Sequence, residues 1–169
     1  MMEIRKTLPV HDVPHDARRN ATAPKLRVEG LVTNPRWIDQ ADLASLPHAS
    51  LNEDFSCEEG WTVPAQRWSG IALSKVLDLA GPLADAKFVR VGAGAFVVPL
   101  AMEDAETAVL CDTLNDSAIP LEHGAPWRLF VPGKSCYTSV KWVDRLELTS
   151  QPGENAGERI ARSRLPKKP

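Results

Sequence analysis

Short stretches in which apolar and polar residues alternate dominate the chain, and a period of two residues predicts strands. In residues 25–32, for example, Leu26 and Val28 alternate with charged residues. Residues 87–91 and 95–100 are separated by a glycine-rich break, which predicts a hairpin. Further strands are predicted at residues 48–57, 109–112, 127–131 and 142–148.

The helical period of 3.6 residues is clearest in one segment. Leu73, Val76 and Leu77 fall on one helical face, and Gly81-Pro82 ends the segment. Two shorter helices are predicted at residues 39–46 and 102–107, and turns at residues 58–61 and 68–70. Many short strands combined with a few short helices predict an α+β fold.

Both ends of the chain lack a sustained period. Residues 1–24 are polar and rich in proline, histidine and arginine, so we expect an extended N-terminal arm. Residues 150–169 contain almost no apolar side chains, so we expect a disordered basic tail. The folded domain is therefore expected to comprise residues 25–149.

Composition narrows the class of protein. A chain of 169 residues with 43% hydrophobic and 25% charged residues is typical of one soluble globular domain. A net charge of −2 does not indicate a nucleic-acid surface, and no apolar run approaches the ~20 residues of a membrane span. No apolar segment follows Arg18-Arg19, so we expect no export signal and a cytoplasmic protein.

The segment 121–142 contains the most informative polar residues. Arg128 interrupts an apolar run, and a guanidinium in such a place needs an anionic partner because desolvating an unpaired charge is costly. Pro132-Gly133 predicts a turn that brings Ser139 and Lys141 back toward Arg128, which would suit a phosphate. The alternative is an ordinary hairpin with an arginine–carboxylate pair and a solvated lysine, and spacing alone favours that alternative.

The three cysteines form neither a disulfide framework nor a paired zinc motif. Cys57 ends a predicted strand and could place a thiolate, a soft metal ligand, in a cleft; a buried cysteine used as a small hydrophobe is the more common case. Cys111 is expected to fill the core, and Cys136 to face either the same cleft or solvent. A zinc site of Cys57, His123 and Cys136 is conceivable, but no local ligand pair supports it.

Three groups of residues follow one another in a specific order from about Leu26 to Leu148. They are Phe55, Cys57, Gly60-Trp61, Trp68, Gly70-Ile71, Leu73 and Ala80-Gly81; then Asn115, Pro120-Leu121, His123-Gly124 and Pro126 to Leu129; then Tyr137, Ser139, Val140, Lys141 and Trp142. This ordered set resembles the molybdopterin-binding domain of the sulfite oxidase family. It is most similar to the bacterial branch that includes the methionine-sulfoxide-reductase catalytic subunit.

The resemblance implies an α+β domain with a mostly antiparallel sheet and a molybdenum–molybdopterin cofactor. Carried over by position, it makes Cys57 the thiolate ligand of molybdenum. It implies that His123 lies against the pterin and that Arg128 binds the pterin phosphate. Ser139, Val140 and Lys141 would complete that phosphate cradle.

The implied activity is oxygen-atom transfer to or from a small molecule, with electrons exchanged through an unidentified partner and without haem. Tyr137, Trp61 and Arg67 are candidate pocket residues. The alternative is a non-catalytic module that binds or carries the cofactor, or a subunit active only with a partner.

The chain departs from the family pattern in several places. The N-terminal pterin contact of the family has no clear counterpart here, and Asn20 and His15 are the candidates. Glu58 and Glu59 stand where eukaryotic sulfite oxidases have arginine, and their carboxylates would repel sulfite. The immunoglobulin-like and haem domains of longer relatives are absent from this sequence.

Overall fold

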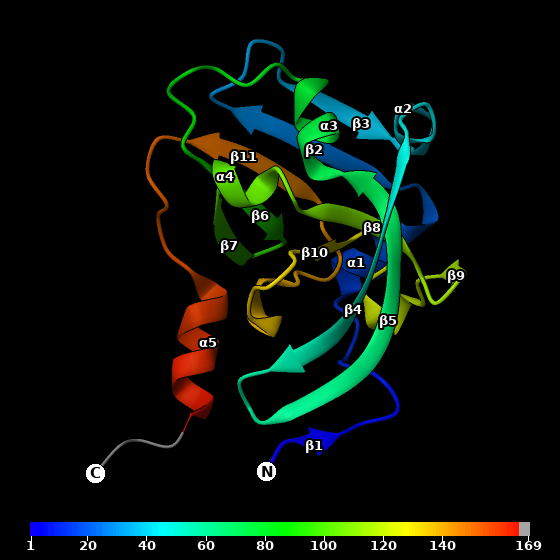
Figure 1. Cartoon of the computed structure of the whole chain (residues 1–169). Helices are drawn as coiled ribbons and strands as arrows, with labels where there is room; N and C mark the ends of the chain where they lie inside the picture. The colour runs from blue at the N-terminus through cyan, green and yellow to red at the C-terminus, as the bar shows by residue number, and fades with distance from the viewer. Residues whose placement is uncertain (166–169) are drawn as a thin grey trace.

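The computed structural model describes residues 1–165 and contains two sheets (Figure 1). The first sheet runs in the order β1-β5-β8-β10, with β4 also paired to β5 and β9 to β8. Its pairs are antiparallel except β1 with β5. Its strands are β1 (Glu3–Ile4), β4 (His48–Cys57), β5 (Trp61–Ala72), β8 (Val109–Leu114), β9 (Ser117–Ala118) and β10 (Arg128–Phe130).

The second sheet runs in the order β3-β2-β11-β6-β7. The strands are β2 (Lys25–Gly30), β3 (Arg36–Asp39), β6 (Phe88–Ala93), β7 (Phe96–Ala101) and β11 (Arg145–Thr149). Only β2 and β11 pair in parallel. The alternating positions Leu26 and Val28 on β2 are fully buried, and β6 with β7 forms the predicted hairpin. The prediction of a mostly antiparallel α+β fold is therefore confirmed.

Short helices connect the strands. Helix α3 buries Leu73, Val76 and Leu77, as the periodicity predicted. Asp39 caps α2 by accepting a hydrogen bond from the Asp42 backbone N–H at 3.0 Å. The helices are α1 (His15–Thr22), α2 (Gln40–Ala44), α3 (Leu73–Asp78), α4 (Met102–Ala105) and α5 (Ala156–Arg164), with 3-10 turns η1 (Leu121–His123) and η2 (Cys136–Thr138).

Two apolar clusters form the core. The larger joins the second sheet to α3 and to Leu129 of β10. The smaller is aromatic and includes Phe55, Trp61, Trp68 and Phe130. Trp68 and Phe130 stack with ring centroids 5.0 Å apart. The buried Arg128 side chain lies against this aromatic cluster, so β10 places a cation beside the Phe55 and Trp68 rings.

The turn predicted at residues 68–70 is wrong, because β5 continues through it to Ala72. This part of β5 is paired on both sides, with β4 and with β8. Gly70 is needed there for close approach rather than for a turn, since a Cβ at Gly70 would clash with the Leu110 carbonyl oxygen.

The expectations for the two chain ends are wrong in part. The N-terminal arm contains α1, and residues 156–164 form α5 where a disordered tail was expected. Asn155 caps α5 by accepting from the Glu158 backbone N–H at 2.9 Å, which supplies a helix start that hydrophobic periodicity does not reveal. Residues 166–169 lie outside the described residues, and a domain limited to residues 25–149 remains a prediction.

The β4–β5 hairpin extends toward the end of the molecule where β1 and α5 lie (Figure 1). The Glu3 backbone N–H donates to the Gly60 carbonyl at 2.8 Å, and Arg164 Nη1 donates to Glu59 Oε1 at 3.4 Å. Both ends of the described chain therefore meet the hairpin tip. Within residues 1–165 we find no helix with the length and apolar character needed to span a membrane.

Candidate functional site

A cavity of about 390 Å³ opens between the N-terminal segment, the end of β4, the loop after β10, and α5. Its walls are largely apolar and its charged groups are mostly cationic. The lining residues are Arg5, Pro9, His11, Pro14, Phe55, Cys57, Glu59, Trp61, Ala93, Phe96, Arg128, Cys136, Tyr137, Ser139, Val140, Lys141, Trp142, Ile160 and Arg164.

Arg128 is the most unusual residue of the cavity, because this charged residue is only 4% exposed. Its Nε donates to Ser139 Oγ at 2.9 Å and its Nη1 to the His123 carbonyl at 3.1 Å. Its guanidinium carbon lies 5.1 Å from the Phe55 ring centroid and 5.2 Å from that of Trp68. Burial lowers the pKa of Arg128 to about 10, so the group remains charged at neutral pH. No carboxylate of residues 1–165 forms an ion pair with it.

The predicted turn at Pro132-Gly133 brings the following segment back onto β10. The Leu129 backbone N–H donates to the Val140 carbonyl at 2.9 Å, and Ser139 Oγ donates to the Leu129 carbonyl at 2.8 Å. Ser139, Val140 and Lys141 therefore line the same cavity as Arg128. The ordinary hairpin with an arginine–carboxylate pair is not what this part of the chain forms.

Lys141 is the second cation of the cavity, and it is held by backbone oxygens. Its Nζ donates to the Glu122 carbonyl at 2.9 Å and to the Pro9 carbonyl at 3.2 Å, and lies 3.0 Å from His11 Nδ1. Burial, and then the nearby Arg128 charge, lowers the pKa of Lys141 to about 7. Lys141 therefore loses its proton more easily than an exposed lysine does.

Gly124 sets the position of Lys141. It has a φ of +120°, and a Cβ at this position would lie 3.0 Å from Lys141 Cβ. Only glycine accepts both this backbone conformation and this close contact. The His123-Gly124 turn therefore packs directly against the lysine.

His123 lies beside the cavity, and its ring is not among the lining groups. Its carbonyl accepts from Arg128, while its Nδ1 is buried without a hydrogen-bond partner in the described part of the chain. Burial, followed by the charges of Lys141 and Arg128, lowers the pKa of His123. A contact between the ring and a pterin stays a prediction.

Cys57 and Cys136 face each other on the cavity wall. Cys57 ends β4, Cys136 begins η2, their Cα atoms are 5.0 Å apart, and their sulfurs are joined in a disulfide. Cys111 is unpaired and fully buried in β8, and burial raises the pKa of its thiol, so the prediction of a core cysteine is confirmed. Residues 1–165 contain no group of three or more side chains arranged to hold a metal ion by themselves.

The cavity mouth is formed by the two chain ends and the β4–β5 turn. Glu59 lines the cavity and is neutralised by Arg164, while Glu58 is exposed and is not a lining residue. The expected repulsion of sulfite by two adjacent carboxylates is therefore reduced to one paired carboxylate. Arg5 lies over the Trp61 ring at 4.9 Å and pairs with Glu3 at 3.1 Å.

Several residues differ from the expectations for the pocket. Trp61 and Tyr137 line it, but Arg67 pairs with Asp116 outside it. Asn20 accepts a hydrogen bond from the Lys25 backbone N–H at 3.1 Å, and His15 is exposed, so neither reaches the cavity. The polar N-terminal residues that do reach it are Arg5 and His11. The residues missed by sequence reasoning are Arg5, His11 and Arg164.

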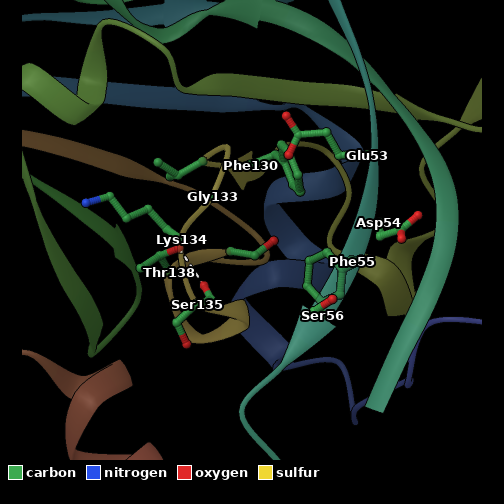
Figure 2. A pocket seen from close by; sticks show the side chains of 11 residues that line it. Glu53, Asp54, Phe55, Ser56, Phe130, Gly133, Lys134, Ser135 and Thr138 are labelled. Atoms are coloured by element: carbon green, nitrogen blue, oxygen red, sulfur yellow. Dashed lines mark hydrogen bonds between the residues drawn. The ribbon is translucent and has the colours of Figure 1, made fainter. Parts of the chain in front are cut away.

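A second pocket of about 220 Å³ shares Phe55 and Ser139 with the cavity (Figure 2). Figure 2 shows Ser135 and Thr138 of the 132–139 loop on one side, and Phe55 and Ser56 of β4 on the other. Lys134 at its edge is neutralised by Asp104 at 3.0 Å. This pocket therefore adds no free cation to the Arg128 and Lys141 pair.

The sequence of the chain is similar to those of known proteins. Residues 11–156 match the family described as the oxidoreductase molybdopterin binding domain. The uncharacterised oxidoreductase YuiH of Bacillus subtilis is 28% identical over 143 residues, covering 83% of this chain and 71% of that protein. The protein-methionine-sulfoxide reductase catalytic subunit MsrP of Campylobacter jejuni is 24% identical over 159 residues, covering 82% and 53%.

Two further similarities concern proteins larger than this chain. A putative protein-methionine-sulfoxide reductase subunit, YedZ1, of Azospira oryzae is 29% identical over 138 residues, covering 79% of this chain and 52% of that protein. The crystal structure of the sulfane dehydrogenase SoxCD from Paracoccus pantotrophus superposes with a TM-score of 0.71 and 27% identity, covering 78% of this chain and 39% of that one. The chain thus spans about half the length of the two methionine-sulfoxide reductase relatives.

Proposed function

Because the chain belongs to the oxidoreductase molybdopterin binding domain family, we propose that its cavity binds a molybdenum–molybdopterin cofactor and catalyses oxygen-atom transfer to or from a small molecule. The observation that supports this most strongly is the buried guanidinium of Arg128, which has no carboxylate partner within residues 1–165. An unpaired buried charge costs several kcal/mol, and a bound anion would offset that cost.

The groups in the cavity fit the phosphate of a pterin cofactor. Arg128 offers its remaining N–H donors, Lys141 a point charge, and His11 a ring nitrogen beside Lys141. Ser139 orients the guanidinium, and Val140 helps to exclude water from one wall. Apolar and aromatic side chains around these groups suit the flat ring system of a pterin.

Cys57 is the residue we assign to molybdenum, as a thiolate ligand once its disulfide is reduced. When bound, the cofactor supplies two-electron redox chemistry at the metal. The chain contributes position and environment: Phe55 and Trp61 exclude water beside Cys57, while Tyr137, Arg5 and Arg164 border the path from the mouth.

Names of relatives suggest which substrates to examine. Two relatives are named for methionine sulfoxide in proteins and a structural neighbour is named for sulfane, so all three names refer to sulfur compounds. We propose a small sulfur compound as the substrate class. Since two relatives are named as subunits, we also propose that a separate redox partner exchanges electrons with this chain.

Turnover of the reduced, cofactor-loaded protein tests the proposal. Sulfoxides would be offered with reduced viologen as electron donor, and sulfite or thiosulfate with ferricyanide as acceptor. We expect turnover with at least one substrate, and a loss of at least about 100-fold in Arg128→Gln, because the cofactor is no longer held in place. Arg90→Gln is the matched control, since Arg90 is a half-buried arginine paired with Glu147 in the second sheet.

Two results would change the proposal. Bound cofactor without turnover on any substrate would favour a carrier module or a subunit that needs its partner. For Cys57→Ala we expect lost activity and changed visible absorption with the pterin partly retained by Arg128 and Lys141. An unchanged visible absorption spectrum in Cys57→Ala would contradict the assignment of Cys57 as the metal ligand.

A further inference from the structure

We propose that Cys57 and Cys136 form a redox-sensitive thiol pair, and that their disulfide prevents the cavity from taking up the molybdenum of the cofactor. This inference rests on the proposed role of Cys57 as the metal ligand. It adds a second residue, Cys136, that decides whether that ligand is available.

The first support is the distance between the two residues. They are 79 positions apart in the sequence, yet their Cα atoms are 5.0 Å apart, which lies within the range that disulfides require. Both side chains line the same cavity. Reduction would therefore leave two thiols side by side on the cavity wall.

The second support is that hydrogen bonds fix the backbone on both sides of the pair. Cys57 is the last residue of β4 and is paired in register with Trp61 of β5. The Ser139 backbone N–H donates to the Cys136 carbonyl at 3.1 Å, and Thr138 Oγ1 donates to the Ser135 carbonyl at 2.7 Å. The same loop faces the end of β4 across the small pocket (Figure 2).

Helix α5 holds the loop from the other side. Gly157 lies so close to η2 that a Cβ there would be 2.7 Å from the Tyr137 carbonyl oxygen. The two cysteines lie on β4 and η2, and α5 packs against η2. Packing and backbone hydrogen bonds therefore hold the two cysteines close together.

The third support is selective access. Cys136 is half-buried and borders the open cavity, whereas Cys111 is fully buried and donates its S–H to the Val109 carbonyl at 3.6 Å. A small disulfide can therefore reach Cys136 but not Cys111. Oxidation of the folded protein is expected to be confined to the Cys57–Cys136 pair.

The chemical step is thiol–disulfide exchange with a low-molecular-weight disulfide such as oxidised glutathione. The Cys136 thiolate attacks one sulfur of that disulfide and releases one thiol, and the Cys57 thiolate then displaces the second thiol. Two cysteine thiols lose two electrons in total, and the oxidant becomes two thiols that carry the two protons. A disulfide sulfur has no thiolate charge to donate to a metal, so oxidation removes the proposed ligand.

The test compares uptake of molybdenum by the oxidised and reduced full chain. Cofactor-free protein would be treated with dithiothreitol or with oxidised glutathione, freed of reagent, and incubated anaerobically with molybdenum cofactor released from a purified molybdoenzyme. Molybdenum per chain is measured by mass spectrometry of the metal. Peptide mapping without reduction reports which cysteines are linked. Cys136→Ser keeps Cys57 but cannot form the disulfide, and Cys111→Ser is the matched cysteine control.

We expect oxidised wild type to take up at least about tenfold less molybdenum than reduced wild type, with Cys57 and Cys136 linked in the map. Cys136→Ser should take up similar amounts after either treatment, and Cys111→Ser should behave as wild type. Equal uptake by linked and reduced wild type would overturn the inference while leaving the proposed function intact. Failure of oxidised glutathione to link the pair would also overturn it. Absence of uptake by reduced wild type and by Cys136→Ser would instead refute the proposed function, and the inference with it.

Discussion

The Nε of Arg128 lies 2.9 Å from the hydroxyl oxygen of Ser139, eleven residues further along the chain, in a place almost closed to solvent. This hydrogen bond directs the guanidinium without neutralising it, because Ser139 Oγ carries no charge and itself donates to the Leu129 carbonyl. The cofactor-free protein therefore keeps a desolvated positive charge at a fixed position. A bound phosphate would remove that penalty.

Arg128→Gln should abolish binding of simple phosphate to the cofactor-free protein. Inorganic phosphate at ten times its Kd should stabilise wild type by about 1.4 kcal/mol, which corresponds to a rise in Tm of about 3–5 °C for a chain of this size. Differential scanning fluorimetry at constant ionic strength measures the shift. The Arg90→Gln control should keep the wild-type response, and an equal response in Arg128→Gln would contradict the assignment.

Lys141 should give the cofactor-free protein a distinct pH dependence. Its folded pKa of about 7 lies below the ordinary value of 10.5, so between these values the unfolded chain binds the additional proton. Burying the Lys141 ammonium therefore lowers the free energy of unfolding at neutral pH. This loss of stability decreases as pH rises from 7 toward 10.5. Urea unfolding from pH 6.5 to 9.5 should show a steeper rise in stability for wild type than for Lys141→Met.

Lys134→Met is the control for this titration, because Lys134 lies at the surface and pairs with Asp104. It should leave the pH profile of unfolding unchanged. Phosphate affinity of wild type should fall above pH 7, as Lys141 loses its proton. Parallel stability profiles for wild type and Lys141→Met would show that the lysine is not desolvated.

Gly124→Ala should weaken phosphate binding although it replaces no charged residue. The φ of +120° is unfavourable for alanine, and the new methyl would lie 3.0 Å from Lys141 Cβ, so we expect a loss of stability of about 1–3 kcal/mol and displacement of the lysine. Gly94→Ala is the matched control, since Gly94 also has a positive φ but open space around it. Isothermal titration calorimetry should show weaker phosphate binding by Gly124→Ala than by Gly94→Ala. Equal affinities of the two variants would refute the role of Gly124.

Gly157→Leu should move α5 away from η2 and open the cavity. The leucine side chain cannot fit where a Cβ already lies 2.7 Å from the Tyr137 carbonyl oxygen. Reduced protein should then react several-fold faster with a bulky maleimide at Cys136. Arg159→Leu adds the same side chain to an exposed position of α5 and should react as wild type. Identical rates for Gly157→Leu and wild type would show that α5 does not cover the site.

The sequence predicted well those features that depend on local pattern. Period-two alternation located β2 and the β6–β7 hairpin, and Pro132-Gly133 predicted the turn that brings Ser139 and Lys141 to Arg128. These features follow from residue preferences within a few positions, so they are readable without tertiary information.

The features that were missed depend on contacts between distant segments. His11 reaches the cavity only because Lys141, 130 residues later, lies beside it. Helix α5 has few apolar residues and depends on the Asn155 cap and on packing of Gly157 against η2. The Cys57–Cys136 pair likewise arises from tertiary packing, since nothing in the spacing of the cysteines indicates it.

The most direct test of the central claim is the amount of molybdenum and of pterin bound per chain. The protein would be produced in a host that makes the cofactor and purified in the presence of dithiothreitol, with metal measured by mass spectrometry and pterin by fluorescence after oxidation. We predict close to one molybdenum and one pterin for each chain. Folded protein with free Cys57 and Cys136 thiols but neither molybdenum nor pterin would contradict the account.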